Sequence, residues 1–245
     1  MNIFGMTDIG AVRSENQDSY TVRHLGENAA VAVVCDGMGG ARAGNVASAV
    51  AVEIFAAAVE DLYRQKTPEG ERDCYGVLRE ACLHANTQVY QLSRSDEQYR
   101  GMGTTLVAAL LLGTDAYVAN VGDSRCYRIH NETISQVTKD HSLVQLLVSR
   151  GDITPEEARN HPKKNLITRA LGVDRDVAAD CYHIVCQEGD HLLLCSDGLS
   201  NVLTDETLLE QTQEPISLEE QCRSLMRMTL ERGAPDNVTI VMAQL

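Results

Sequence analysis

Apolar residues run in short blocks along the chain, and most of these blocks predict β-strands. Residues 2–9, 19–24 and 29–35 fit strands at the N-terminal end, and the block at 30–35 contains no polar residue. A short apolar block bounded by turn residues is typical of a strand that is buried on both faces. We therefore expect residues 29–35 to form a buried strand.

Helical spacing replaces this pattern in the next segment. Apolar residues from Val46 to Leu62 recur every three or four positions and predict an amphipathic helix over residues 42–64. The same spacing predicts a second helix over residues 71–93. We interpret both apolar stripes as core-facing rather than as binding surfaces.

Short strands return at 104–112, 115–121, 125–130 and 133–138, and tight turns separate them. Connections as short as these force antiparallel pairing. The pattern therefore predicts a four-stranded β-meander.

Residues 139–176 interrupt the strand pattern. A short helix is expected at 142–150 and ends at Gly151, and Thr154 opens a capping box with proline at the first helical position. This insertion lies beside aspartate-bearing strands in the sequence, so we interpret it as a lid or a substrate-contacting flap.

The C-terminal segment predicts strands at 178–185 and 190–196, then two helices, then a last strand at 238–242. Ser217 begins a capping box at the second of these helices, and Gly233 ends that helix. Strands, two helices, strands, two helices and a strand form a layered α+β order rather than alternating βαβ units.

Length and charge narrow the class of protein. The chain has 245 residues and no linker-like or low-complexity tract, so we expect a single domain over residues 1–245 with a real core. The formal net charge is −14 and no Lys/Arg cluster is present, which disfavours nucleic acid and anionic membranes as partners. An acidic surface around carboxylates favours cations instead.

The placement of the eight cysteines argues against disulfide bonds. Cys35 and Cys195 lie in apolar strands, Cys74, Cys82 and Cys222 fall on apolar helix faces, and no Cys-x-x-Cys pair occurs. Buried free thiols are typical of a reducing compartment. Neither a secretory signal nor a membrane span is recognisable. We therefore expect a cytoplasmic protein.

Aspartates mark several strand ends. Asp36, followed by Gly37, and Asp197 each follow an apolar strand, Asp236 precedes the last strand, and Asp18 precedes an early one. Carboxylates at strand ends are what a hard-cation site assembled from several strands requires. Asp-Gly is also a common turn dipeptide, and any one of these aspartates alone fits that interpretation. The four together favour a cation site.

The ligand types indicate Mg²⁺ or Mn²⁺, since both prefer oxygen ligands, whereas zinc favours histidine or thiolate clusters. Asp36, Asp197, Asp236, Asp18 and the Gly37 carbonyl are the candidate ligands. Two such ions ~4 Å apart can share a carboxylate and a hydroxide for in-line attack on phosphorus.

Arg13, five residues before Asp18, has the two-donor fork that binds a phosphate. An ordinary surface arginine fits the same spacing, and the sequence alone does not separate these two interpretations.

Competing catalytic motifs are weaker. No cysteine is followed by arginine six positions later, as a tyrosine-phosphatase loop requires. The Asp-x-Asp at Asp174 follows no buried strand, and no nucleophile elbow surrounds Ser196. Hydrogen bonding and capping suffice to explain His141, and we interpret His161 as a solvated loop residue.

Seven motifs occur in an order that resembles one known family. They are Arg13-Ser14-Glu15-Asn16-Gln17-Asp18, Asp36-Gly37-Met38-Gly39-Gly40, Gly101-Met102-Gly103-Thr104-Thr105, Gly122-Asp123-Ser124-Arg125, Asp140-His141-Ser142, Ser196-Asp197-Gly198 and Gly233-x-x-Asp236-Asn237. The chain resembles the bacterial branch of the metal-dependent PP2C-type (PPM) serine/threonine protein phosphatases. Each motif is weak alone, but their order over nearly the whole chain is specific.

The resemblance implies an α+β fold, a four-layer α-β-β-α sandwich of two antiparallel sheets with helix pairs outside and a flap at about 139–176. It implies hydrolysis of phosphoserine and phosphothreonine in proteins by a metal-bridging hydroxide, without a covalent intermediate. The implied cofactors are two Mn²⁺ or Mg²⁺ ions, with a third, weaker ion in bacterial members. Phosphoproteins are the implied substrates, with a cognate serine/threonine kinase as a candidate partner.

The resemblance also assigns roles. Asp36 resembles the carboxylate that bridges both metals, with the Gly37 carbonyl on the first metal. Asp197 and Asp236 resemble ligands of the second metal. Asp123 resembles the carboxylate that holds the third metal together with Asp197.

Arg13 resembles the phosphate-binding arginine. Two positions depart from animal members of the family. Gln17 stands where those members carry a ligating glutamate, so Asp18 is expected to act directly or through water. Met38 replaces a histidine proposed to protonate the leaving group, which leaves that role to a metal-bound water.

Two other functions fit the sequence less well. A pseudophosphatase would keep the fold as a binding module but would need lost metal ligands, and every expected aspartate is present. A metal-dependent phosphodiesterase or nuclease is disfavoured by the acidic charge.

Overall fold

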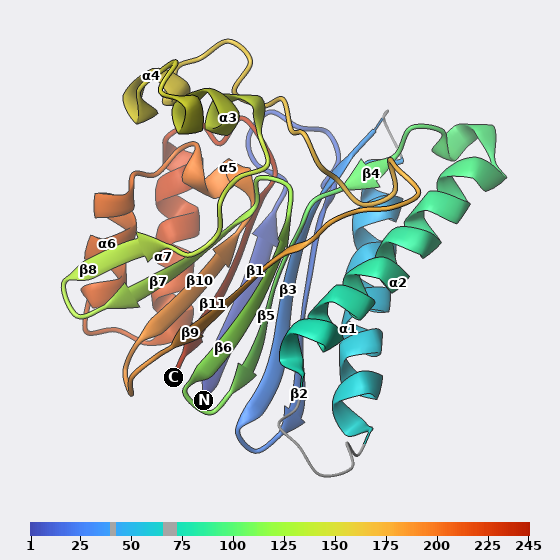
Figure 1. Cartoon of the computed structure of the whole chain (residues 1–245). Helices are drawn as coiled ribbons and strands as arrows, with labels where there is room; N and C mark the ends of the chain where they lie inside the picture. The colour runs from blue at the N-terminus through green and yellow to red at the C-terminus, as the bar shows by residue number, and fades with distance from the viewer. Residues whose placement is uncertain (40–42, 66–72) are drawn as a thin grey trace.

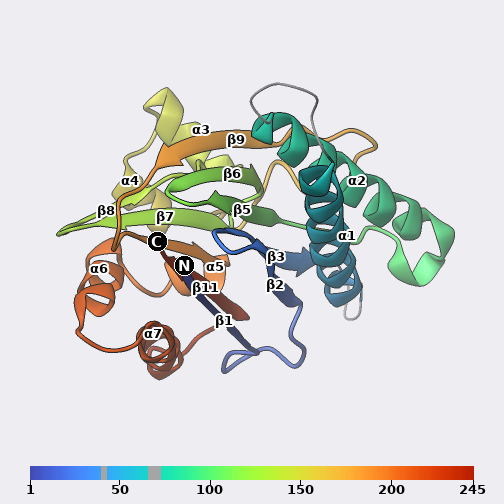
Figure 2. The same ribbon diagram turned by 90° about the horizontal axis from the view of Figure 1, so that it is seen from below.

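Two antiparallel sheets pack face to face at the centre of the molecule, and helices cover the outer face of each sheet (Figures 1 and 2). The structure is a computed structural model and describes residues 1–39, 43–65 and 73–245. The predicted helix starts at residues 42 and 71, and Gly40 of the predicted glycine turn, lie outside the described residues.

The first sheet has five strands, which in spatial order are β1 (Asn2–Asp8), β11 (Val238–Gln244), β10 (His191–Cys195), β7 (Arg125–His130) and β8 (Thr133–Gln136). The second sheet is built, in spatial order, from β2 (Asp18–Gly26), β3 (Ala29–Met38), β5 (Leu106–Leu112), β6 (Asp115–Val121) and β9 (Asp180–Val185). A short strand, β4 (Gly103–Thr104), pairs with the end of β3.

The helices fall into three groups. Two long helices, α1 (Gly44–Arg64) and α2 (Cys74–Ser95), cover the second sheet, and η1 (Glu97–Tyr99) follows α2. On the first sheet lie α6 (Asp205–Gln213) and α7 (Leu218–Glu231), after a single turn, α5 (Asp197–Ser200). The flap contains α3 (Leu143–Arg150) and α4 (Pro155–Arg159), at the end of the sandwich opposite the chain termini (Figure 1).

The core forms where apolar faces of neighbouring layers meet. In β3, Val31, Val33 and Cys35 face α1 and α2, whereas Ala32 and Val34 face the other sheet. Alternate residues of a strand point to opposite faces, so a strand covered on both sides must be apolar throughout. The predicted buried strand is confirmed.

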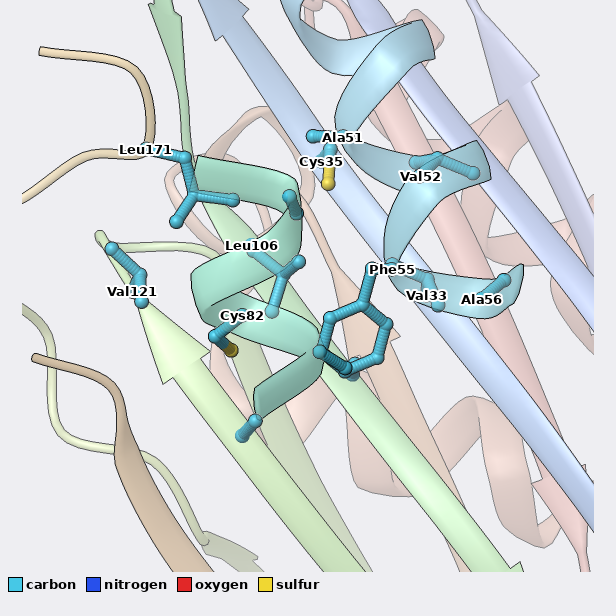
Figure 3. Close-up of a cluster of buried hydrophobic side chains, with 14 of the residues drawn as sticks. Val33, Cys35, Ala51, Val52, Phe55, Ala56, Cys82, Leu106, Val121 and Leu171 are labelled. Atoms are coloured by element: carbon cyan, nitrogen blue, oxygen red, sulfur yellow. The ribbon is translucent and has the colours of Figure 1, made fainter. Parts of the chain in front are cut away.

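Figure 3 shows the layer between the helices and the second sheet. Phe55 of α1 is fully buried there and points toward Val33 of β3 and Leu106 of β5. Small residues such as Ala51 and Ala56 let α1 approach the sheet closely. The apolar stripe predicted along this helix therefore faces the core.

The predicted β-meander is wrong. The hairpins β5–β6 and β7–β8 exist, but β6 pairs with β9 and β7 pairs with β10, so the chain crosses between sheets at residues 122–124. Gly122 adopts a φ of 110° at this crossing. Such a φ is readily accessible only to glycine and turns the chain out of the sheet that β6 has just completed. A three-residue connection can therefore join strands of facing sheets as well as neighbours in one sheet.

Smaller differences concern element boundaries. The predicted strand at 104–112 is divided into β4 and β5, since Gly103 and Thr104 pair with β3 beyond the point where β5 leaves it. The strand expected from 178 begins at Asp180, and the one expected to end at 138 ends at Gln136. The short helix α5 was not expected.

The helix caps agree with the sequence. Thr154 and Glu157 form the predicted capping box of α4, and Ser217 forms one with Glu220 at α7. Gly151 ends α3 with a φ of 77°. Each cap satisfies backbone groups that the helix itself leaves without partners.

Candidate metal and phosphate site

Two of the predicted ligands face each other across neighbouring strands. Asp18 of β2 and Asp36 of β3 are direct partners in the antiparallel register. Like charges at directly opposed positions destabilise a sheet. Asp18 is buried and Asp36 is half-buried, which increases this cost. A cation bound at this position would remove it.

Three further aspartates approach Asp36 from other parts of the fold. Asp197 begins α5, Asp236 precedes β11, and Asp123 lies in the crossing between β6 and β7. Asp36 experiences the charge of all three as well as that of Asp18. The structure therefore brings together the four aspartates that the sequence placed at strand ends and Asp123, which only the family resemblance indicated.

Burial dominates the titration of these carboxyl groups. Loss of solvation raises the pKa of Asp18 to about 7 and that of Asp123 to about 8. The same cause, together with Asp236, raises the pKa of Asp197 to about 6. Burial and the surrounding carboxylates hold the pKa of Asp36 well above its usual range. Carboxyl groups with pKa values raised in this way are poised to bind a positive charge.

The glycines that follow two of these aspartates allow close approach of neighbouring chain segments. A Cβ on Gly37 would lie 2.0 Å from the backbone oxygen of Gly44, and one on Gly198 would lie 1.9 Å from that of Asn237. Gly37 lies within β3 and Gly198 within α5. The alternative that these Asp-Gly pairs are ordinary turns is therefore wrong for both.

Hydroxyl groups fix the carboxylate of Asp18. Ser196 and Thr239 each donate to Asp18 Oδ2 at 2.7 Å. Thr239 lies in β11 of the first sheet and Ser196 directly follows β10 of that sheet, whereas Asp18 belongs to the second sheet. Ser196 also accepts from the Thr239 amide, so its hydroxyl is engaged structurally and it is not an exposed nucleophile.

A second pair of hydroxyl groups holds the backbone around Asp36. The Asp36 amide donates to Thr105 Oγ1 at 2.9 Å, and Thr104 Oγ1 donates to the Asp36 carbonyl at 2.9 Å. Thr105 in turn shares a 2.7 Å hydrogen bond with Ser124, next to Asp123. The sequence motifs contained these residues, but their positioning role was missed because hydroxyl residues are ordinary members of strands.

Arg13 reaches the same region from the loop before β2. Its guanidinium donates to Asp236 Oδ2 at 2.7 Å, and its side chain is about half exposed (51 %). Asn237 ties down this loop by donating to the carbonyls of Ile9 and Glu15 and accepting from the Gln17 amide. The arginine is therefore placed beside the carboxylates and remains accessible to a ligand.

The carboxylate oxygens at this site indicate which kind of ion they can bind. Among the described residues, none donates to the buried Asp18 Oδ1 or the buried Asp197 Oδ1. A buried carboxylate oxygen without a partner is costly, and a hard divalent cation is its natural partner. The acid-only set therefore fits Mg²⁺ or Mn²⁺.

The carboxylates are not arranged as a finished ligand cage. Across the part of the chain that the structure describes, no three His, Cys, Asp or Glu side chains form a group ready to hold a metal. Asp236 accepts from Arg13, and Asp197 Oδ2 accepts from Asn201 at 2.9 Å. These oxygens are directed toward protein donors that an ion would have to displace.

A cleft of about 590 Å³ leads away from the carboxylates. Asp123 and Asp197 line it together with residues of the flap, of α5 and of the start of α6. Its apolar lining includes Val144 and Val148 of α3 and Val202. The predicted flap thus lies beside the site.

The remaining candidates take structural roles. His141 is buried in a hydrogen-bond network, and Ser142 caps α3 by accepting from the Gln145 amide at 3.2 Å. The segment around Asp174 is an irregular turn held by Asn86, as expected for the end of a flap. All eight cysteines are free.

Comparison with solved structures defines the class of protein. The chain is similar to a bacterial serine phosphatase with a TM-score of 0.91 at 35 % identity, covering 100 % of this chain and 97 % of the other. It is also similar to the catalytic domain of the serine/threonine protein phosphatase PstP in complex with two manganese ions (TM-score 0.84, 37 % identity, 99 % and 97 % covered). The fold is that of bacterial serine/threonine phosphatases.

A family model described as protein phosphatase 2C matches residues 11–234, and the chain belongs to that family. Serine/threonine phosphatase stp of Listeria welshimeri is 39 % identical over 238 residues, covering 97 % of this chain and 93 % of its own. The family resemblance, the α+β fold class and the assignment to protein serine/threonine phosphatases are confirmed.

Proposed function

We propose that this chain hydrolyses phosphoserine and phosphothreonine in proteins and depends on Mn²⁺ or Mg²⁺. The observation that carries this proposal is the convergence of Asp18, Asp123, Asp197 and Asp236 on the half-buried Asp36 in a member of the protein phosphatase 2C family. The similar PstP catalytic domain is a complex with two manganese ions, which supports the choice of metal.

Each of the proposed metal ligands has its own role. Asp36 would bridge two ions, with the Gly37 carbonyl on one and Asp197 and Asp236 on the other. Asp18 would act directly or through water, since its Oδ2 is held by two hydroxyl groups while Oδ1 has no donor among the described residues. When bound, such ions supply an activated water and positive charge at the phosphoryl group.

Asp123, with Asp197, is the proposed holder of a third and weaker ion. These two aspartates line the cleft, so a cation held between them would border solvent. This placement is consistent with an ion that exchanges more easily than the pair around Asp36.

Arg13 is the proposed phosphate ligand. Its guanidinium can present two parallel N–H donors to two phosphoryl oxygens. Exchange of its present partner, Asp236, for a phosphoryl group would free that carboxylate for a cation. Phosphate binding and metal binding would then favour each other.

Water is the proposed nucleophile, and no side chain is proposed to be phosphorylated. Burial raises the pKa of the Cys195 thiol to about 12, which keeps it protonated and unreactive. Ser196 is committed to Asp18 and Thr239. Met38 has no proton to give, so no side chain is assigned as the general acid. The proton that the leaving group takes up is assigned to solvent water.

The polypeptide that carries the phosphoresidue is proposed to follow the cleft below the flap. The cleft is continuous with Asp123 and Asp197 and offers apolar side chains on α3. A phosphoprotein chain, rather than a small metabolite, needs such a path. A serine/threonine kinase that produces these phosphoproteins is the corresponding candidate partner.

Among the described residues, no helix combines the length and apolar character needed to cross a bilayer.

The proposal is tested by turnover of a phosphothreonine peptide across a titration of Mn²⁺ and Mg²⁺, with a chelator control. Asp36→Asn should lose activity by orders of magnitude, because it removes the shared carboxylate, and should remain folded, because it also removes a costly buried charge. Asp61→Asn, an exposed position on α1, is the matched control and should behave as wild type.

Two results would contradict the proposal. Full activity of Asp36→Asn would remove Asp36 from the site. Metal-loaded wild-type protein that turns over no phosphomonoester but binds a phosphoprotein would favour the pseudophosphatase.

A further inference from the structure

A buried histidine joins the base of the flap to the turn that carries Asp123. His141 is 7 % exposed, and its backbone amide donates to the Gly122 carbonyl at 2.8 Å. Its backbone carbonyl accepts from the Thr168 amide at 2.7 Å, at the other end of the flap. His141 therefore lies where both ends of the flap meet the crossing between the sheets.

The ring of His141 holds the same turn by a second bond. The Gly122 amide donates to His141 Nδ1 at 3.1 Å. A backbone amide is always the donor, so Nδ1 carries no proton and the ring proton lies on Nε2. Nε2 then donates to Asp180 Oδ2, 3.1 Å away. Both polar groups of the Gly122 backbone are thus bound to one residue.

Asp180 and Arg169 fix this tautomer from the flap side. Arg169 Nη1 donates to Asp180 Oδ1 at 2.8 Å and also lies 3.2 Å from His141 Nε2. Both nitrogens are donors, so they share the Asp180 carboxylate rather than bond each other. The carboxylate keeps the Nε2 proton in place, which leaves Nδ1 free to accept from Gly122.

The turn has little freedom to choose another position. A Cβ on Gly122 would lie 2.6 Å from the Thr105 side chain, and Ser124 is bound to that same threonine. Asp123 is therefore suspended between two fixed points, Gly122 held by His141 and Ser124 held by Thr105. Loss of either point leaves the carboxylate of Asp123 without a defined direction.

We propose that His141 is a positioning residue that acts through Asp123, and that its Nδ1 acceptor sets the affinity for a divalent ion at Asp123 and Asp197. This inference rests on the proposed function. It assigns to the flap base a role in metal binding, since Arg169 and Asp180 determine which ring nitrogen faces the turn.

Two substitutions separate the two ring nitrogens. In His141→Asn the amide oxygen can occupy the position of Nδ1 and accept from Gly122, whereas in His141→Gln the amide nitrogen can occupy the position of Nε2 and donate to Asp180. We expect His141→Gln to weaken the Mn²⁺ site at Asp123 about 10-fold, the scale of a lost outer-shell partner. His141→Asn should stay within about two-fold of wild type, because it keeps the acceptor that the turn needs.

Mn²⁺ binding is measured by isothermal titration and by electron paramagnetic resonance of free Mn²⁺, together with kcat and KM against Mn²⁺ concentration. His161→Gln changes another flap histidine, whose ring accepts from the nearby Lys163 amide at 3.1 Å, and is the matched control. It should bind Mn²⁺ as wild type does.

A double-mutant cycle decides whether His141 acts through Asp123. The effect of His141→Gln on Mn²⁺ affinity should disappear in an Asp123→Ala background. Equal effects of the Asn and Gln variants, or an effect that persists without Asp123, would overturn the proposal. So would a lower melting temperature with unchanged Mn²⁺ binding. If wild-type protein binds Mn²⁺ but turns over no phosphopeptide, the proposed function fails while the binding measurements still test His141.

Discussion

The ion pair between Arg13 and Asp236 links the two halves of the proposed chemistry at the scale of single residues. Each partner has a second proposed ligand, a phosphoryl group for Arg13 and a cation for Asp236. The pair is partly exposed, with side chains 51 % and 28 % accessible, so its net contribution to stability is small. It can therefore be exchanged for those ligands at little cost.

Arg13→Ala should raise KM for a phosphopeptide by roughly ten-fold to a hundred-fold, the scale of a lost hydrogen bond to a charged group. The effect on kcat should be smaller. The KM of Arg13→Lys should lie between those of wild type and Arg13→Ala, because lysine keeps the charge but loses the two-donor fork. Steady-state kinetics at saturating Mn²⁺ measure both constants, and an unchanged KM in Arg13→Ala would remove this arginine from the phosphate site.

The individual aspartates could be predicted from sequence, but their supports could not. Asp36 and Asp197 stand out because a carboxylate at the end of an apolar strand is costly without a function. Thr105, Ser196 and Thr239 do not stand out, because serine and threonine in or beside strands have many ordinary reasons to be there. Only the distances between sheets reveal that they hold carboxylates.

At the scale of elements, the two flap helices pack only shallowly against the rest of the fold. Neither α3 nor α4 has a fully buried residue, although α3 is rich in Leu and Val. Val144 and Val148 face the cleft, while Leu146 is 45 % exposed and lies outside its lining. One face of α3 thus borders the proposed path of the substrate, and another face does not.

Val148→Asp should raise KM for a phosphopeptide several-fold, because a charge in the cleft must be desolvated when the peptide binds. Turnover of para-nitrophenyl phosphate, which does not extend into the cleft, should be unchanged. Leu146→Asp on the same helix is the control and should alter neither substrate. Equal effects of Val148→Asp on both substrates would contradict the proposed peptide path.

Element types were predictable, whereas strand partners were not. The hairpins at Gly113 and Asn131 were expected from their turn residues and are present. The turn at Gly122 is also made of small and polar residues but joins different sheets. Periodicity reports which face of a strand is buried, and it contains no information about which sheet the strand joins.

At the scale of the whole molecule, the site lies across the junction between the two sheets. Asp18 and Asp36 belong to one sheet, whereas Thr239 belongs to the other and Ser196 directly follows a strand of it. Carboxyl groups buried at this junction connect metal binding to the stability of the fold.

The metal-free protein should become less stable as pH rises from about 5 to about 8. The folded-state pKa values of Asp18, Asp197 and Asp123, about 7, 6 and 8, lie above the ordinary value of 3.8, so the folded state holds more protons than the unfolded state in this window. The contribution of these groups to stability is therefore fully present below the unfolded-state pKa and is lost as pH rises through the folded-state pKa values.

Melting temperatures in chelator across this range measure the effect. Added Mn²⁺ should raise the melting temperature most at pH 8, where the carboxylates are ionised. A melting temperature that rises with pH in chelator would show that these groups are already ionised in the folded protein.

The position of the aspartates at the inter-sheet junction has one more consequence. Neither β-layer by itself holds the complete set of acidic groups, so the ability to bind ions belongs to the assembled sandwich and to no smaller fragment of it. A partly unfolded chain would therefore be catalytically silent until β11 has taken its place between β1 and β10.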